Sequence, residues 1–216
     1  MPERDSLGVE NMILPIYPRS LLDLGITDGF ARIAISVDGT GKLTDVLPVA
    51  YSRRDFADSS MAAIRQWVFH PMKLHNEPVT ACTEVTFNFQ GTGVVVSLDS
   101  STAIAAYLAR TLNTEARAPC KFPDLDRIPT PVKCDAPVYA RELYDHGVSG
   151  DAIVEFWIDE QGHVRMPAVI SADFDELGAL AANAVATWQF EPPTHNNRPV
   201  LTKARQTFHF RAQGSK

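Results

Sequence analysis

Two kinds of hydrophobic spacing alternate along the first half of the chain. Between residues 31 and 37 every second residue is apolar, which is the period of a half-buried β-strand. Asp38 to Gly41 supplies turn residues, so residues 43–49 are expected to return as the second arm of a hairpin. From Asp55 the apolar spacing becomes three and four, which predicts a helix that ends before Pro71. After Pro78 the period returns to two as far as Phe89, which predicts a last strand.

The second half of the chain repeats this order of elements and also repeats several of the residues. Eight of them recur 121 residues later: Trp67, Phe69, Pro71, Asn76, Pro78, Val79, Phe87 and Phe89 are matched by Trp188, Phe190, Pro192, Asn197, Pro199, Val200, Phe208 and Phe210. A period this long lies outside the range of roughly 20 to 50 residues that marks repeat arrays. The chain is therefore a duplicated domain.

The patterns predict an α+β fold. Each module is expected to have the order α-β-β-α-β, with a three-stranded antiparallel sheet packed by helices. The first module is assigned to residues 14–90 and the second to residues 137–211. Residues 91–136 form the connecting segment, which is expected to contain a helix over residues 101–113 and then an extended, proline-rich crossing.

Composition narrows the classes of partner. The chain has 216 residues and a formal charge of -6, so it offers no basic field for nucleic acid or an anionic membrane surface. No apolar run approaches the roughly 18 residues that a membrane-spanning helix needs. Met1 to Gly8 lacks the basic and apolar regions of a signal peptide, which leaves open a cytoplasmic protein or a chain whose leading segment was removed.

Candidate chemistry is sparse. Cys120 and Cys134 could close a disulfide loop with Cys82 left over, but nothing in the sequence fixes the redox compartment, so both states stay open. His70 and His75 flank Pro71, yet no cysteine or carboxylate cluster completes a set of metal ligands. No phosphate-binding loop or nucleophile motif is present. We expect no catalytic residue, no cofactor and no metal.

Taken together, several short features resemble one known family. Tyr17-Pro18 opens a short helix, Gly25 and Gly29 precede the hairpin, and the string from Trp67 to Pro71 closes the main helix. With the turn at 38–41 and Pro78-Val79 before the last strand, each module resembles the C-terminal domain of the TonB family of periplasmic energy transducers, a fold type shared with the TolA C-terminal domain. The second module departs from this pattern at Tyr139-Ala140.

The resemblance implies a function in binding protein. TonB domains are thought to hold a short segment of outer-membrane transporters as an added β-strand, and the outer edge of the last strand is expected to be open for this. Carried over to this chain, the contact surface consists of Leu14, Ile16, Tyr17, Pro18, Thr80, Cys82, Glu84 and Thr86, with Lys203 and Arg205 available to acidic peptide residues. The resemblance also implies a periplasmic or cell-envelope location.

Other interpretations remain open at this point. The polar residues of the last strands are also what a solvated face carries, and cations on an exposed strand guard against aggregation. If the last strands of the two modules pair with each other, the edge is structural, and the protein is an adaptor that docks on an envelope complex. An enzyme of unknown type is a third alternative. The partner and the oligomeric state are not specified by the sequence.

Overall fold

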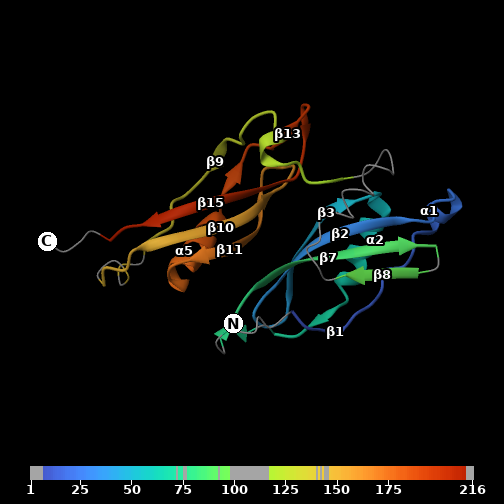
Figure 1. Cartoon of the computed structure of the whole chain (residues 1–216), viewed down its shortest axis with the longest axis horizontal. Helices are drawn as coiled ribbons and strands as arrows, with labels where there is room; N and C mark the ends of the chain where they lie inside the picture. Colours follow the sequence, from blue (N-terminus) through green and yellow to red (C-terminus); the bar gives the residue numbers. More distant parts are fainter. Residues whose placement is uncertain are drawn as a thin grey trace. The chain divides into compact units, whose positions relative to one another are not determined.

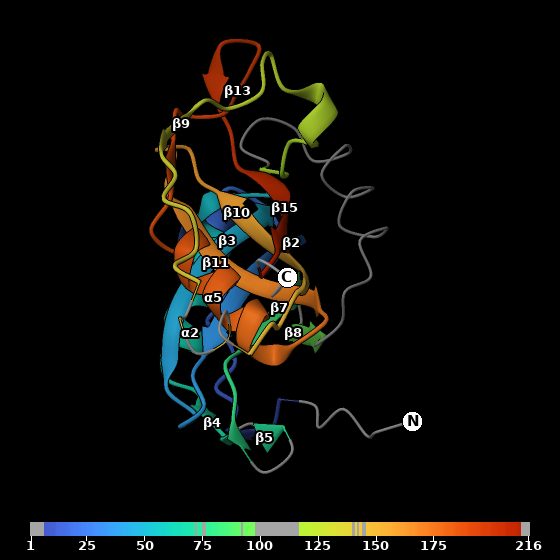
Figure 2. The same ribbon diagram turned by 90° about the vertical axis from the view of Figure 1, so that its left-hand side faces the viewer.

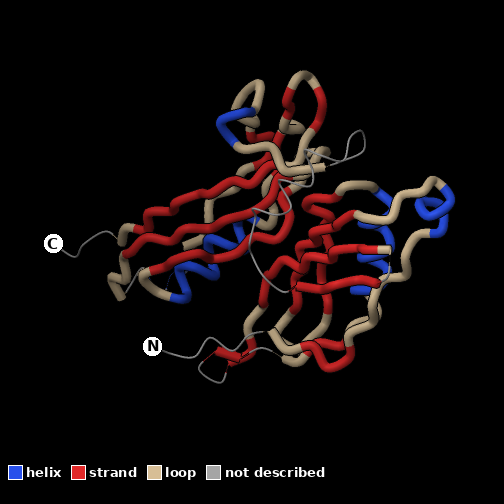
Figure 3. The backbone as a smooth tube through the Cα atoms, turned by 45° about the vertical axis from the view of Figure 1, so that its right-hand side comes forward, coloured by secondary structure: helices blue, strands red, loops and turns tan. Residues whose placement is uncertain are grey.

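The computed structural model divides the chain into two compact units, residues 1–118 and residues 119–216. It describes residues 7–71, 73–74, 77–91, 93–97, 117–139, 141, 143 and 146–212. The helix expected over residues 101–113 lies outside the described residues. Each unit contains an antiparallel sheet with a helix against one face, as the sequence predicts, and Figure 3 shows this strand-rich backbone.

The first unit has a four-stranded sheet in the order β3-β2-β7-β8, so the expected three strands are joined by a fourth, β8. Its elements are β1 (Val9–Asn11), α1 (Arg19–Asp23), β2 (Gly29–Val37), β3 (Leu43–Tyr51), α2 (Arg54–Ile64), β4 (Val68–Phe69), β5 (Lys73–Leu74), β6 (Glu77–Pro78), β7 (Ala81–Gln90) and β8 (Gly93–Ser97). Strand β2 pairs with β3, which confirms the predicted hairpin, and its other side pairs with the last strand, β7. Pro48 lies in the edge strand β3, where its missing N–H costs no ladder bond to a further strand.

The core of the first unit lies between this sheet and α2. Alternate residues of β2 point into it, together with Phe56 and Ile64 of α2 and Phe87 and Phe89 of β7. Trp67 is buried as the helical spacing predicts, and its ring packs against Phe69 and Phe87. The alternate apolar residues of the strands and the apolar face of the helix therefore pack against each other at one interface.

The second unit has a three-stranded sheet in the order β11-β10-β15, with α5 packed on β10 and β11 (Figures 1 and 2). Its elements are η1 (Phe122–Asp124), β9 (Pro131–Lys133), β10 (Gly150–Ile158), β11 (Val164–Ala172), α5 (Asp175–Val185), β12 (Gln189–Phe190), β13 (Thr194–His195), β14 (Arg198–Pro199) and β15 (Thr202–Phe210). Leu177, Ala181 and Val185 of α5 are fully buried against the sheet.

In both units a leading segment is tied to the end of the main helix in the same way. The indole N–H of Trp67 donates to the carbonyl of Ile13, and that of Trp188 donates to the carbonyl of Asp135, each at 2.8 Å. The leading strands β1 and β9 pair with β4 and β12, the short strands next to these tryptophans. Residues 131–135, which the sequence assigns to the connecting segment, thus contact the second module directly.

The hairpin turns of the two modules have the same pattern of hydrogen bonds. The carboxylate of Asp38 accepts hydrogen bonds from the N–H groups of Thr40 and Lys42, and that of Asp159 accepts them from Gln161 and His163. Gly162 closes its turn with φ of +84°, and its carbonyl accepts a hydrogen bond from Phe190 at 2.8 Å. A Cβ atom at Gly162 would lie 1.9 Å from the carbonyl oxygen of Phe190, so the backbone comes too close for any side chain there.

We predict that Gly162→Ala destabilises the second module more than Gly147→Ala does. Gly147 also has a positive φ, +70°, but a Cβ atom there would meet nothing within 4 Å. Both variants carry the strain of a left-handed residue, about 1 to 2 kcal/mol, and only Gly162→Ala adds a collision with backbone. Urea unfolding followed by tryptophan fluorescence in a Trp67→Phe background reports the second module, which holds the other two tryptophans. Equal losses would show that the close approach has no energetic consequence.

Candidate functional site

The outer edge of the last strand differs between the two modules. In the first module β8 pairs with β7, from Thr86 opposite Ser97 to Gln90 opposite Gly93, and runs beside it in Figure 1. The expectation of an open edge is therefore wrong over residues 86–90 of this module. Two glycines at positions 91 and 93, followed by Val94, Val95 and Val96, are a hairpin signal that could have predicted β8.

The residues proposed on β7 point to the face of the sheet opposite α2. Val85, Phe87 and Phe89 belong to the core, so the alternation of a strand places Cys82, Glu84 and Thr86 on the other face. Glu84 lies 3.3 Å from the buried guanidinium of Arg32 on β2. Burial raises the pKa of the Cys82 thiol, and a hydrogen bond from Ser36 partly offsets this rise. Thr80 is exposed just before β7.

The other proposed residues of the first module belong to the leading segment on the helix side. Leu14 and Ile16 are exposed, and Ser59 of α2 donates a hydrogen bond to the carbonyl of Ile16. Tyr17 anchors the segment, because its hydroxyl donates to the carbonyl of Ile26 at 2.9 Å and its ring packs edge-on against Phe56. Pro18 directly precedes α1. The structure thus places Leu14 to Pro18 on the opposite side of the sheet from the β7 side chains.

In the second module β15 pairs with β10 on one side, and no described strand pairs along its other side. The amide of Cys120 bonds to the carbonyl of Leu201 at 2.8 Å, so the backbone groups of odd-numbered residues face this outer edge. The pairing of β10 leads to the same assignment. Asp151 lies opposite His209, and its amide donates to the carboxylate of Asp173 on the side away from β15. Arg205, Thr207 and His209 therefore direct their N–H and C=O groups outward.

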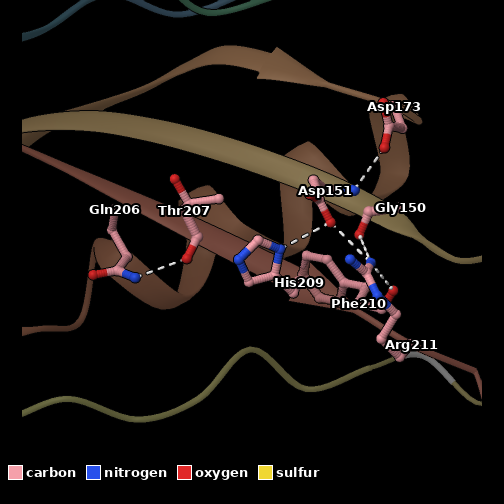
Figure 4. Close-up of polar contacts among 8 residues, drawn as sticks. All are labelled: Gly150, Asp151, Asp173, Gln206, Thr207, His209, Phe210 and Arg211. Carbon is pink, nitrogen blue, oxygen red and sulfur yellow. Dashed lines mark hydrogen bonds and ion pairs between the residues drawn. The ribbon is translucent and has the colours of Figure 1, made fainter.

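One of these outward carbonyls is bonded to a side chain. The amide group of Gln206 donates to the carbonyl of Thr207 at 2.7 Å (Figure 4). This carbonyl faces the outer edge, so the side chain of Gln206 takes the place that a neighbouring strand would take. The matched residue of the first module is Val85, whose side chain is buried in the core. An alignment of the two modules shows that Gln206 replaces Val85, but it does not reveal that the side chain of Gln206 bonds to the edge of the sheet.

Lys203 and Arg205 stand on the face of β15 away from α5. Both bond to the carboxylate of Glu155 on β10, at 3.0 Å and 2.7 Å. Burial alone would raise the pKa of Glu155, but the hydrogen bonds from Arg205 and Lys203 hold it below its ordinary value. Lys203 also lies over the ring of Trp157, 4.5 Å from its centroid. The two cations named from the sequence thus share one internal carboxylate.

A hollow of about 400 Å³ opens beside these residues. It is lined by Phe122, Glu155, Lys203, Ala204 and Arg205. Phe122 comes from η1, which follows the short stretch at Cys120 that lies alongside Thr202. Its side chain is partly exposed, so the hollow combines an apolar ring with charged groups at the start of the outward edge.

The other end of β15 carries a second group of charges. Figure 4 shows Asp151 between His209 and Arg211, and its Oδ1 lies 3.0 Å from the imidazole and 2.8 Å from the guanidinium. Hydrogen bonds from His209 and then Arg211 lower the pKa of Asp151. Thr207 therefore lies between Glu155, which bonds to Lys203 and Arg205, and Asp151, which contacts His209 and Arg211.

The remaining candidate chemistry concerns the cysteines and the acidic and histidine side chains. All three cysteines are free thiols in the structure, and burial raises the pKa of Cys120 and Cys134. Within the described ranges, no three His, Cys, Asp or Glu side chains are grouped so that they could hold a metal ion. Among the helices that the structure describes, none has both the length and the apolar character to cross a membrane.

The architecture defines a tandem of two α+β modules, each with an antiparallel sheet, a main helix and a leading segment fixed by a tryptophan. The family model described as Gram-negative bacterial TonB protein C-terminal matches residues 14–90 and residues 135–212. The chain belongs to this family. The family is one of non-enzymatic, periplasmic protein-interaction domains, so membership supports a role in binding another protein in the cell envelope.

A solved structure is also similar. The solution NMR structure of the Pseudomonas aeruginosa TonB C-terminal domain is 25% identical to this chain, with a TM-score of 0.38, and the match covers 45% of this chain and 98% of that one. No curated protein matches the chain significantly.

We predict that Asp151 makes the stability of the second module depend on acid pH. Its pKa is lowered in the folded state, so its contribution is fully present above the ordinary value of about 4 and is lost as pH falls through the folded value. Between about pH 5 and about pH 3 the parent protein should lose more stability than Asp151→Asn. Urea midpoints at the two pH values, read in the Trp67→Phe background, measure this difference. Parallel losses in the two proteins would contradict it.

Proposed function

We propose that the second module binds an extended segment of a partner protein as an added strand along β15. The observation that carries the proposal is the row of outward N–H and C=O groups at Arg205, Thr207 and His209, beside which no described strand lies. Such a row pairs with an extended peptide through backbone hydrogen bonds, and pockets beside it select side chains. The hollow at Phe122 is such a pocket.

The hydrogen bond between Gln206 and the carbonyl of Thr207 must break before a strand can bind along this edge. An incoming strand needs the carbonyl of Thr207, so the side chain of Gln206 must release it. The hydrogen bond from Gln206 is replaced by a hydrogen bond from the added strand. The net free-energy cost of this exchange is small, because a typical hydrogen bond contributes only about 1 kcal/mol. The carbonyl of Thr207 is thus protected in the free protein and becomes available when a partner strand binds.

The first module has a different requirement. Its proposed contacts on β7 include Thr86, which pairs with Ser97 of β8. A peptide can use the full length of β7 only after β8 has left it, whereas Leu14 and Ile16 are exposed without any rearrangement. We therefore assign constitutive strand addition to the second module. An outer-membrane transporter is the class of partner that the family resemblance implies.

The adaptor alternative, in which the two last strands pair with each other, is weakened by the same observation. A strand has one outer edge, and residues 86–90 of β7 already use theirs for β8. A structural protein would then need a different surface for docking. Strand addition requires no such additional surface.

We predict that Thr207→Pro weakens peptide binding about tenfold or more and leaves the module folded. Proline removes the outward N–H, and this N–H makes no bond to β10, so the sheet keeps its ladder. The probe is a fluorescein-labelled peptide of about 8 residues in which valine alternates with glutamine, the length of a typical strand. Fluorescence anisotropy gives its dissociation constant.

The matched control is Thr207→Val, which changes the side chain and keeps the backbone donor. It should bind the peptide as the parent protein does. Circular dichroism establishes that both variants are folded. Equal binding by a folded Thr207→Pro variant would refute strand addition at β15.

A further inference from the structure

The two modules differ in charge at matched positions of their last strands. With the spacing of 121 residues, Cys82 corresponds to Lys203, Glu84 to Arg205, and Asn88 to His209. Strand β7 carries one acidic residue and no Lys or Arg, whereas β15 carries Lys203 and Arg205 and no acidic residue. Strand β8, which lies against β7, carries no charged residue, because it consists of glycine, valines and serine. The closed edge is neutral to acidic, and the open edge is basic.

This basic edge stands out against the rest of the protein. The whole chain has a formal charge of -6, so a general excess of basic residues does not explain two cations on one short strand. Arg205 in particular keeps 67% of its side chain exposed while it bonds to Glu155. Its guanidinium therefore has further donors directed to solvent.

The distances within a sheet decide which charge an incoming strand meets. Neighbouring strands lie about 4.8 Å apart, so a strand added to β15 lies one spacing from Arg205 and about two from Glu155 and Asp151 on β10. Directly opposite side chains in neighbouring strands lie about 5 Å apart and interact strongly enough to favour opposite charges. The nearer cations thus dominate the field at the position of the added strand.

We infer that the open edge of β15 selects an extended segment with acidic side chains on the face shared with Arg205. This inference rests on the proposed strand addition and names the chemistry of its ligand. Glu155 acts as an internal competitor, because its carboxylate bonds to Arg205 and Lys203 until an acidic residue of the ligand approaches. The Phe122 ring offers apolar contact beside the same cations. The first module, closed by β8 and with Glu84 at the matched position, lacks this preference.

The test compares two labelled peptides of about 8 residues, one alternating valine with glutamate and one alternating valine with glutamine. The parent protein should bind the glutamate peptide about fivefold more tightly, which corresponds to about 1 kcal/mol for a cross-strand charge pair. Arg205→Gln should bring this ratio close to one. Glu155→Gln should raise it, because the internal competitor is removed. The ratio in the parent protein should fall at high salt.

Arg198→Gln is the control variant, since Arg198 is exposed on β14 and the change in net charge is the same. It should leave the ratio of the parent protein unchanged, and a matching fall there would overturn the inference by showing a general charge effect. Equal binding of the two peptides by the parent protein overturns the inference and leaves strand addition standing. Failure of both peptides to bind overturns strand addition, and the inference falls with it.

Discussion

The outward backbone groups of an edge strand must be satisfied, and this requirement shapes both modules. In each sheet the inner side of β7 or β15 pairs with the first arm of the hairpin. The first module satisfies residues 86–90 of its outer side with β8, a strand of its own. In the second module Cys120 bonds to the first part of the edge, and Gln206 bonds to the carbonyl of Thr207. The duplicated framework has therefore reached two different solutions to one constraint.

The outer edges of the two modules can differ because the contacts that hold each fold together lie elsewhere. The buried tryptophans hold the leading segments, the Asp38 and Asp159 turns close the hairpins, and the main helices cover one face of each sheet. None of these features involves the outer side of the last strand. Changes such as Glu84 in one copy and Arg205 in the other alter the surface of the edge and leave the core contacts in place. Binding properties can thus differ between copies that share one fold.

The sequence predicts most of the architecture because the core depends on local periodicity. The spacing of two in β2 and of three and four in α2 is visible without any tertiary information. The leading strands β1 and β9 escape prediction because each has only three residues and is stabilised by a partner far along the chain. Strand β8 is also short, and its role depends on an edge that only the assembled sheet creates. The cations were named from the sequence, but their sharing of Glu155 follows from the register of β10 and β15.

Amide hydrogen exchange along the two last strands of the free protein distinguishes an open outer edge from a paired one. Strand addition at β15 predicts fast exchange at Arg205, Thr207 and His209, slow exchange at the residues between them, and slow exchange throughout residues 86–90 of β7. This pattern would establish one closed edge and one open edge in the same chain. Uniform protection along β15 would show that its outer side is already paired, and it would contradict strand addition at the second module.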